Sequence, residues 1–506
     1  MLLLGIDVGT TNWKAAIFDE NGHLLTISAT KTITHLDKNN WATYDPNEMW
    51  TSIATIIKQV TSKIDKPEKI VAVSVTSMAE SIVPLDKNGN PTFPIIAWFD
   101  RRSLPQSQFL EQKIGEERII EITGNDNNPI FSLSKILWIR DNDPLAFHQA
   151  KKWLCVADFI YYKLTKKFAT DYTIASRTLL LDINRKTWSE ELLDIAELSK
   201  DLLPAIYPSG TIIGGVSKEA AEQTGLKKGT PVVVGGQDHP CGLLGSGTMI
   251  GHKILDSSGT AESFIAISGK NAISPNKFSG LRYSRYLDPQ FLLTWGGIIA
   301  SGLSVDWAIE KLFNSDKLNY AKIIKELEKT VPGSHGLLYL PHLRGSGPPY
   351  WDPKSRGAFI GLKDIHTRGD MLRAVIEGLC FEARIILELI KNNLHYQFDA
   401  INTIGGSARN HFWQQTKADI IGMQVEVPEV EEVAAKGACL LAGTGIGIYK
   451  NMLDASIKTY SIKNKFIPNY KNKKVYDELF KIYKQLYKKL SPINRKLYTI
   501  SNYIKR

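Results

Sequence analysis

The sequence predicts an α/β protein built from two topologically related halves. Apolar runs of strand length alternate with segments of helical periodicity along most of the chain, as in α/β folds. A weak internal repeat relates the halves, because residues 3–19 and 254–267 both contain an apolar strand, an aspartate, a Gly-Thr turn and a second apolar strand. The length of 506 residues provides for two or three domains.

The period of the apolar residues places the individual elements. A polar Glu-Asn-Gly turn after the second apolar run predicts that the first three strands form a hairpin or meander. Apolar runs predict strands at residues 2–6, 15–18, 70–75, 231–234, 254–255 and 401–404. A period of about 3.6 predicts helices at residues 46–63, 132–140, 158–164, 217–224, 304–312, 370–392 and 410–421.

The composition is that of a folded globular protein, with 43% hydrophobic and 23% charged residues. No apolar stretch approaches the roughly 18 residues of a membrane-spanning helix, so we expect neither secretion nor membrane insertion. The four cysteines lie far apart and form no CxxC pair, which favours buried thiols in the reducing cytoplasm.

The net charge of +10 is concentrated in the C-terminal tail. Residues 461–506 hold 13 Lys or Arg and 2 Asp or Glu, so the rest of the chain is nearly neutral. Apolar residues spaced by three and four predict an amphipathic helix with a lysine-rich outer face, and an RNA-binding or membrane-surface role is the lesser alternative. The apolar residues are Tyr476, Leu479, Phe480, Tyr483, Leu486, Tyr487 and Leu490.

The first chemical motif is the turn that follows the first predicted strand. Glycines there allow phosphate to approach the backbone, and Thr10 and Thr11 can donate hydrogen bonds to it. Asp7 can hold Mg²⁺ directly or through water, and Lys14 adds a cation. An ordinary hairpin is the alternative interpretation, since the chain contains neither a Walker loop nor GxGxxG.

A second motif surrounds Asp238, which ends the predicted strand at residues 231–234 among glycines and precedes His239. Open α/β sheets bind ligands at the carboxyl ends of their strands, so Asp238 is a candidate catalytic residue. The alternative is an aspartate that caps the following helix.

Two further glycine-rich turns belong to the second half of the chain. Residues 256–260 form another phosphate-type turn, and residues 404–410 lead from a strand through glycines into a helix, which suits packing against an adenine or ribose. A plain strand-to-helix turn is the alternative for the latter. Phosphate turns from the two halves would face one nucleotide across a cleft.

Candidate sugar contacts lie between residues 78 and 102. Glu80 and Trp98 provide a carboxylate and an indole, which often bind sugar hydroxyls and sugar C–H faces, while Asp100 and Arg102 can form a structural ion pair. The ten histidines show no HExxH motif and no zinc spacing with cysteine, so a transition-metal site is not expected.

Together these motifs resemble the FGGY carbohydrate kinase family, in particular its xylulokinase and gluconokinase-like branch. The resemblance extends from Gly5 to about Gly447. Its most specific stretch is GAFIGL, seven further residues and then DMLRAVIE, which matches the family's second signature position by position. Two further stretches are also characteristic: PPYWDP at residues 348–353, before this signature, and AAKGACLLAG at residues 434–443, after it. Within the signature, GAFIGL spans residues 357–362 and DMLRAVIE residues 370–377.

The resemblance implies two ribonuclease-H-like domains of the sugar kinase and actin fold, with ATP, Mg²⁺ and sugar meeting in the interdomain cleft. The implied domains are residues 1–247 and 248–450, followed by a basic helical extension, residues 451–506, packed on the body. Asp238 corresponds to the catalytic base and Asp7 to the metal-associated aspartate. Matched nucleotide contacts are Thr10, Thr11, Lys14, Gly259, Thr260, Gly302, Gly406 and Asn410, and matched sugar contacts are Met78, Glu80, Trp98, Asp238 and His239.

The implied activity is ATP-dependent phosphorylation of a small ketose such as a pentulose, a sugar acid or a polyol in carbohydrate catabolism. Ala79 stands where glycerol kinases carry arginine, which disfavours glycerol, while xylulose and gluconate both remain open. The implied partners are the sugar and ATP, without nucleic acid or membrane, and a homodimer is left open. The alternative is a non-metabolic ATPase switch or a ligand sensor of the same fold.

Overall fold

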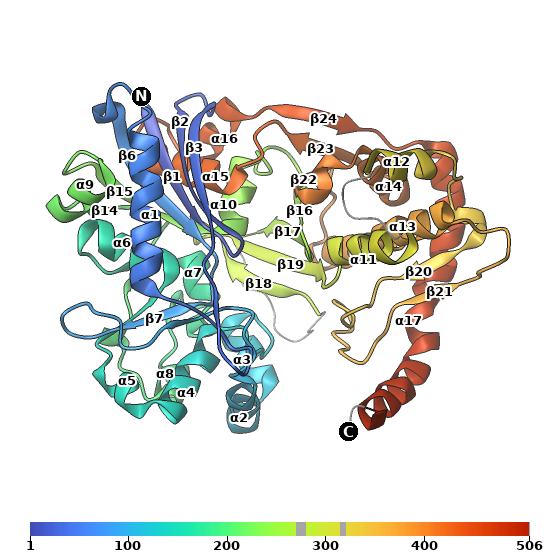
Figure 1. Cartoon of the computed structure of the whole chain (residues 1–506), viewed down its shortest axis with the longest axis horizontal. Coiled ribbons are helices and arrows are strands. Elements are labelled where there is room, and N and C mark those ends of the chain that lie inside the picture. The colour runs from blue at the N-terminus through green and yellow to red at the C-terminus, as the bar shows by residue number, and fades with distance from the viewer. Residues whose placement is uncertain (270–279, 314–319, 505–506) are drawn as a thin grey trace.

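The computed structural model describes residues 1–269, 280–313 and 320–504, and two mixed β-sheets organise them (Figure 1). The N-terminal sheet has the strand order β14 (Ile212–Gly215), β15 (Pro231–Gln237), β6 (Ile70–Ser77), β1 (Leu2–Val8), β2 (Asn12–Asp19) and β3 (Leu24–Lys31). The C-terminal sheet has the order β18 (Arg282–Arg285), β19 (Leu292–Ile298), β17 (Glu262–Ser268), β16 (Lys253–Ser258), β22 (Ala400–Gly405), β23 (Gln424–Pro428) and β24 (Ile462–Phe466).

The two sheets share one topology, which confirms the internal repeat. In the N-terminal sheet, β1, β2 and β3 form an antiparallel meander, β6 and β15 continue it in parallel, and β14 is antiparallel. In the C-terminal sheet, β16, β17 and β19 form the meander, β22 and β23 are parallel, and β24 is antiparallel. The Gly-Thr turns of the repeat connect β1 to β2 and β16 to β17, so they lie at equivalent places.

The predicted helices are all present, with ends within two residues of those expected from the apolar period. The first is fixed by its N-terminus, where the Asp45 carboxylate accepts from the N–H groups of Asn47 and Glu48 and Pro46 occupies the first turn. The helices are α1 (Pro46–Thr61), α4 (Ser132–Asn142), α6 (Val156–Thr165), α9 (Lys218–Thr224), α11 (Gly302–Phe313), α13 (Arg368–Leu394) and α14 (His411–Ile421).

A helical lobe is inserted between β6 and β15, and it carries part of the candidate sugar site. It has an apolar core of its own and touches the C-terminal sheet at β18, where the N–H of Tyr283 donates to the carbonyl of Gly124 at 2.8 Å. Besides α4, its helices are α2 (Leu104–Ile114), α3 (Glu116–Thr123), α5 (Pro144–Gln149), α7 (Tyr172–Ser176) and α8 (Glu190–Ala196). Short strands form four small separate sheets: β4 (His35–Leu36), β5 (Ala42–Tyr44), β7 (Ile82–Leu85), β8 (Ile95–Ile96), β9 (Lys152–Cys155), β10 (Ala169–Asp171), β11 (Leu181–Asp182), β12 (Thr187–Trp188) and β13 (Ala205–Tyr207).

Two central helices join the halves. These are α10 (Asp238–Gly245), which follows β15, and α15 (Val433–Gly445), which follows β23. They approach so closely that a Cβ at Gly437 would lie 1.9 Å from the carbonyl oxygen of Cys241. Helix α15 also packs on β1, where a Cβ at Gly5 would lie 2.2 Å from the carbonyl oxygen of Ala435. The core between the sheets therefore belongs to both halves.

The C-terminal tail is part of the C-terminal half. Helix α17 (Tyr470–Ile504) buries Tyr476, Phe480, Tyr483 and Leu486 against the core around α13, which confirms the amphipathic prediction. The tail is not helical throughout, because β24 adds an edge strand to the sheet. The remaining elements are α12 (Tyr320–Glu328), α16 (Met452–Thr459), β20 (Leu338–Leu340) and β21 (Ala358–Ile360).

All four cysteines are buried and unbonded to one another, as expected from their spacing. Over the described ranges, no helix combines the length and apolarity needed to cross a membrane.

Candidate active site

The turn between β1 and β2 holds the first predicted phosphate contacts. The N–H of Gly9 donates to the carbonyl of Asn12 at 3.1 Å, and a Cβ at Gly9 would lie 3.0 Å from that oxygen, so this tight turn favours glycine. Thr10 is partly exposed and Thr11 is exposed. Both hydroxyls therefore belong to a narrow turn at the sheet edge.

Asp7 lies near the end of β1, opposite Lys14 in the β1–β2 ladder. Its Oδ1 atom is buried and has no hydrogen-bond partner. Burial, and then the charge of Asp238, raise the pKa of Asp7 to about 7, while Lys14 opposes the shift. Asp7 and Asp238 are therefore near enough to interact, although they lie far apart in the sequence.

This arrangement fits a Mg²⁺ ion bound together with phosphate. An unpartnered carboxylate oxygen beside a second carboxylate suits a hard cation. Across the described residues, no group of three His, Cys, Asp or Glu side chains could hold a metal ion by itself. The other ligands would be water and phosphate oxygens, as is usual for Mg²⁺ in phosphate-transferring enzymes.

Asp238 is the first residue of α10 and follows the carboxyl end of β15. Because β15, β6 and β1 run parallel, their carboxyl ends meet at the edge where α/β sheets bind ligands. The N-cap position of α10 belongs to Gln237, and the Asp238 carboxylate accepts from the N–H of His239 at 2.7 Å. Asp238 is therefore the first residue of α10 rather than its N-cap, and this partly exposed carboxylate lies at the sheet edge.

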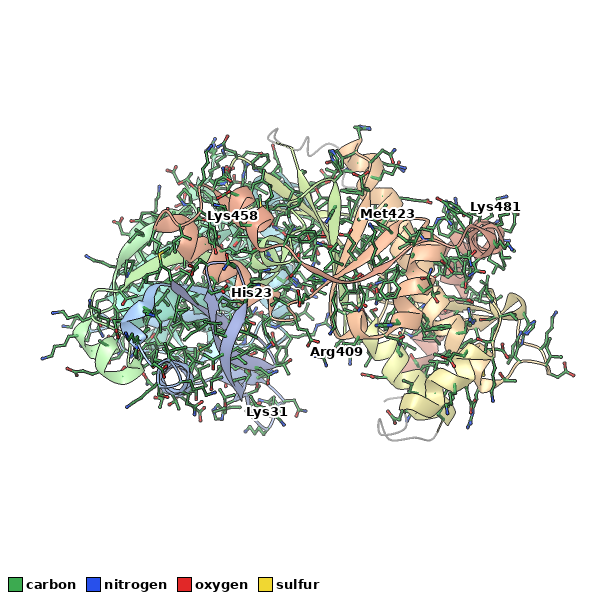
Figure 2. The ribbon with its side chains drawn as sticks, turned by 90° about the horizontal axis from the view of Figure 1, so that it is seen from above. His23, Lys31, Arg409, Met423, Lys458 and Lys481 are labelled. Atoms are coloured by element: carbon green, nitrogen blue, oxygen red, sulfur yellow. The ribbon has the colours of Figure 1, made fainter. Side chains whose placement is uncertain are left out.

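Lys14 forms an ion pair across the two halves. Its Nζ lies 2.6 Å from Oε2 of Glu432, the N-cap residue of α15, and both side chains are partly exposed. The neighbouring Glu431 pairs with Arg409, which Figure 2 shows between the two halves. The predicted phosphate-binding lysine therefore has a carboxylate partner.

Met78 and Trp98, two of the predicted sugar contacts, meet the first turn. The indole Nε1 of Trp98 donates to Oγ1 of Thr10 at 2.8 Å, and the same hydroxyl lies 4.0 Å from the sulfur of Met78. The hydrogen bond connects the predicted sugar contacts directly to the phosphate turn.

Glu80 is buried and paired with an arginine that the sequence motifs did not reveal. Its Oε1 accepts from Nε of Arg177, which follows α7, at 2.6 Å. The guanidinium lies over the ring of Phe131 at 4.8 Å and near Trp295 at 5.7 Å. Trp295, from β19, meets the ring of His239 edge-on at 5.5 Å.

Asp100 and Arg102 form the structural ion pair that was the alternative interpretation. Both are buried, their N–O distance is 2.9 Å, and the guanidinium packs on Trp41 and Trp138. The Asp100 carboxylate also accepts from the N–H of Ala42.

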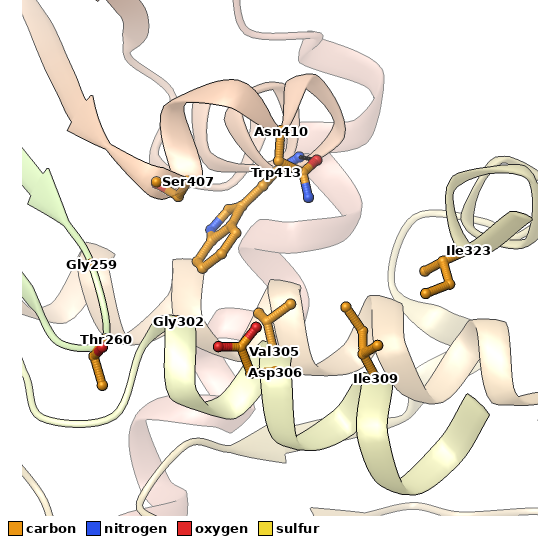
Figure 3. Close-up of a pocket in the computed structure, with 11 residues that line it drawn as sticks. Gly259, Thr260, Gly302, Val305, Asp306, Ile309, Ile323, Ser407, Asn410 and Trp413 are labelled. Carbon is orange, nitrogen blue, oxygen red and sulfur yellow. Dashed lines mark hydrogen bonds between the residues drawn. The ribbon is translucent and has the colours of Figure 1, made fainter. Parts of the chain in front are cut away.

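The second half contains a pocket of about 410 Å³ between α11 and α14 (Figure 3). The indole of Trp413 reaches into the space between the two helices, and Thr260 lies at one end. A Cβ at Gly302 would lie 2.4 Å from the carbonyl oxygen of Gly259, so the helix start and the turn are in close contact. Five predicted nucleotide contacts line this pocket together: Gly259, Thr260, Gly302, Gly406 and Asn410.

A buried ionic cluster lies beneath the second turn. Lys417 of α14 contacts Asp256 of β16, and its Nζ lies 2.7 Å from Oε1 of Glu262 in β17. The other carboxylate oxygen of Glu262 accepts from Oγ of Ser301, just before α11, at 2.6 Å. The cluster thus ties together the elements that surround the turn.

The charges of this cluster compensate one another. Burial and the neighbouring Glu262 raise the pKa of Asp256. Burial alone would raise the pKa of Glu262 as well, but Lys417 outweighs it and lowers that pKa. A protonated Asp256 beside a charged Glu262 and Lys417 makes the cluster electrically neutral.

Two α/β halves of one topology, with a pocket between α11 and α14 and two interacting carboxylates at the sheet edge, are typical of the sugar kinase and actin fold. Family models specify it further: residues 2–245 match the N-terminal domain and residues 256–446 the C-terminal domain of the FGGY family of carbohydrate kinases. The chain belongs to this family and is a carbohydrate kinase with two ribonuclease-H-like halves.

Individual relatives support the same family assignment. The chain is 31% identical to a xylulose kinase of Lactococcus lactis subsp. lactis over 498 residues, covering 98% of both chains. It is 29% identical to a glycerol kinase of Saccharolobus islandicus, covering 93% of both. Among solved structures, a gluconate kinase from Lactobacillus acidophilus has a TM-score of 0.91 at 27% identity, covering 98% of this chain and 99% of that one.

Sequence patterns did not reveal Arg177, Trp295, Glu432 or Lys417. The first three lie outside the motifs and reach the site through the fold. Lys417 had one usable signal: it follows Trp413 by four residues on a helix, so it lies on the inward face. A charged residue at such a position indicates a buried ion pair.

Proposed function

We propose that the enzyme transfers the γ-phosphoryl group of ATP to a hydroxyl of a small carbohydrate, with Asp238 as general base. The acceptor class is a ketose such as a pentulose, or a related polyol or sugar acid. The observation that carries the proposal is that the charge of Asp238 acts on Asp7, whose Oδ1 atom has no hydrogen-bond partner, next to a turn that also contacts Trp98. We also propose that the enzyme acts in the cytoplasm, because all four cysteines are free thiols.

Some residues of the chain would position the substrates, and Asp238 would accept the proton. Phosphoryl transfer proceeds through a loose transition state, so it needs orientation and charge neutralisation more than covalent chemistry. Thr10 and Thr260 would position phosphates from the two halves, and the pocket beside Trp413 would hold the nucleoside. Asp238 would accept the hydroxyl proton at its carboxylate as the new O–P bond forms.

Asp7 would hold Mg²⁺ through its unpartnered Oδ1 atom. When bound, the ion neutralises phosphate charge. Lys14 would exchange its Glu432 partner for phosphate, so the ion pair between the halves would open when nucleotide binds.

Acceptor-dependent ADP release tests this proposal. The enzyme is supplied with ATP, Mg²⁺ and one acceptor at a time from pentuloses, hexuloses, polyols and aldonates. We expect release to depend on the acceptor, because the relatives are a xylulose, a glycerol and a gluconate kinase. Equal release with and without every acceptor would instead indicate an ATPase switch, and no release under any condition would indicate a ligand sensor.

A further inference from the structure

The Glu80–Arg177 pair is held on several sides. Besides Nε, the guanidinium brings a second nitrogen to 2.5 Å from Oε1 of Glu80, and its Nη1 donates to Oδ1 of Asn125 at 3.3 Å. Ser132 donates to the backbone carbonyl of Glu80 at 3.0 Å. Glu80 also has a positive φ of 66°, which is an uncommon backbone conformation for a residue other than glycine.

The pair borders the proposed acceptor site. Glu80 follows Met78, which contacts Thr10 of the phosphate turn. On the other side, Arg177 lies near Trp295, and Trp295 meets His239, the residue after Asp238. The pair therefore lies between the segment of predicted sugar contacts and the segment of the proposed base.

The buried cations around this site have little free charge to offer an anionic acceptor, whereas Arg101, three residues after Trp98, is exposed. Within the described residues, Arg177 is paired with Glu80, and Arg102 with Asp100. Lys135 is completely buried, donates to the carbonyl of Pro129, and has its pKa lowered to about 7 by burial, against the effect of Glu80. The Asp238 carboxylate adds negative charge on the reacting side.

We propose that Arg177 is a specificity-determining residue whose neutralisation by Glu80 makes the site select neutral polyhydroxy acceptors, ketoses or polyols, over sugar acids. This inference rests on the proposed kinase function. A guanidinium has five N–H donors, so those not used by Glu80 and Asn125 can donate to acceptor hydroxyls. An acceptor carboxylate placed beside this pair would lose its hydration without gaining a buried cationic partner.

The experiment compares kcat/KM for matched neutral and acidic acceptors, such as xylulose and xylitol against xylonate and gluconate. For the unaltered enzyme we expect a preference of about 100-fold or more for neutral acceptors. Glu80→Gln keeps the side-chain size but leaves the guanidinium unpaired, so the ratio of acidic to neutral activity should rise at least about tenfold. Glu80→Gln combined with Arg177→Gln removes both charges and should return the ratio toward the original.

The matched control is Glu377→Gln, the same change in the buried Arg373–Glu377 pair of the C-terminal half. It should leave the acceptor ratio unchanged. If kcat/KM of the unaltered enzyme for sugar acids is within tenfold of that for neutral acceptors, the inference is overturned. The kinase proposal would still stand, and this measurement needs no variant. An unchanged ratio in Glu80→Gln would also overturn it. No ADP release with any acceptor would overturn the kinase proposal itself.

Discussion

The hairpin of β1 and β2 and the hairpin of β16 and β17 occupy equivalent places in their sheets, yet the acidic side chains beneath their turns have different surroundings. Beneath the first turn, Asp7 keeps an unpartnered oxygen and faces the charge of Asp238. Beneath the second, Lys417 compensates Asp256 and Glu262 from within the protein. Under the proposed mechanism, the first turn binds an external cation, whereas the charges beneath the second turn are compensated within the protein.

This difference separates reaction chemistry from nucleotide positioning. The first turn needs charge that a ligand can change, because it lies beside the proposed base and metal ligand. The second turn lines the proposed nucleotide pocket, and the buried ionic cluster lies beneath it. Related halves have therefore acquired different electrostatic roles.

The largest difference in kcat is expected between two aspartate-to-asparagine changes, one in each half of the protein. Asp238→Asn removes a general base at nearly constant size, so kcat should fall by about 10²- to 10⁴-fold while acceptor binding is largely retained. Asp256→Asn should keep kcat within about threefold, because the protonated aspartate is already neutral. Steady-state kinetics and acceptor titrations measure both, and Asp238→Asn activity above about a tenth of the original would contradict the role of base.

The next effect concerns stability. Lys417→Met leaves Glu262 buried without its cation, which should cost about 3–5 kcal/mol of the free energy of unfolding. The midpoint of thermal unfolding should fall by roughly 10 °C. Glu262 is almost fully buried, so little of the loss can be recovered by water. A midpoint unchanged within a degree or two would show that the cluster does not stabilise the fold beneath the second turn.

The neutral cluster also predicts a pH dependence. The pKa of Asp256 is raised in the folded state, so its contribution to stability is complete below the ordinary value of 3.8 and is lost as pH rises through the raised value. As pH rises from about 4 to about 8, Asp256→Asn should therefore lose less stability than the unaltered protein. Parallel curves for the two proteins would contradict a protonated Asp256.

The sequence predicts much of this fold because local patterns determine its elements. Periodicity located the helices, and the Gly-Thr echo located equivalent turns in two halves. The strand β24 was missed because Lys463 and Lys465 interrupt its apolar residues. The pairing of Glu80 with Arg177 was missed because a contact between distant segments leaves no local spacing to detect.

Asp7→Asn tests the first turn directly. An amide is a weaker Mg²⁺ ligand than a carboxylate, so the Mg²⁺ concentration for half-maximal activity should rise by about 10- to 100-fold. High Mg²⁺ should restore part of the rate. The matching Asp256→Asn change should leave this Mg²⁺ concentration unchanged. An equal rise in both variants would contradict the difference between the two turns.

The smallest effect is expected at the ion pair between the halves. Glu432→Gln frees Lys14 for phosphate, so the KM for ATP should fall by at most about fivefold, as expected for a partly exposed pair. Its neighbour supplies the control, since Glu431 pairs with the exposed Arg409 and Glu431→Gln should change little. A higher KM for ATP in Glu432→Gln would mean that the pair supports nucleotide binding rather than competing with it.

The most direct test of the account follows the phosphoryl group itself by ³¹P NMR. The reaction contains the enzyme, ATP, Mg²⁺ and the acceptor that gives the fastest ADP release. We predict a new phosphomonoester signal that grows in equal amount with ADP and is absent without acceptor. Inorganic phosphate growing with ADP, with or without acceptor, would contradict a carbohydrate kinase mechanism for this site.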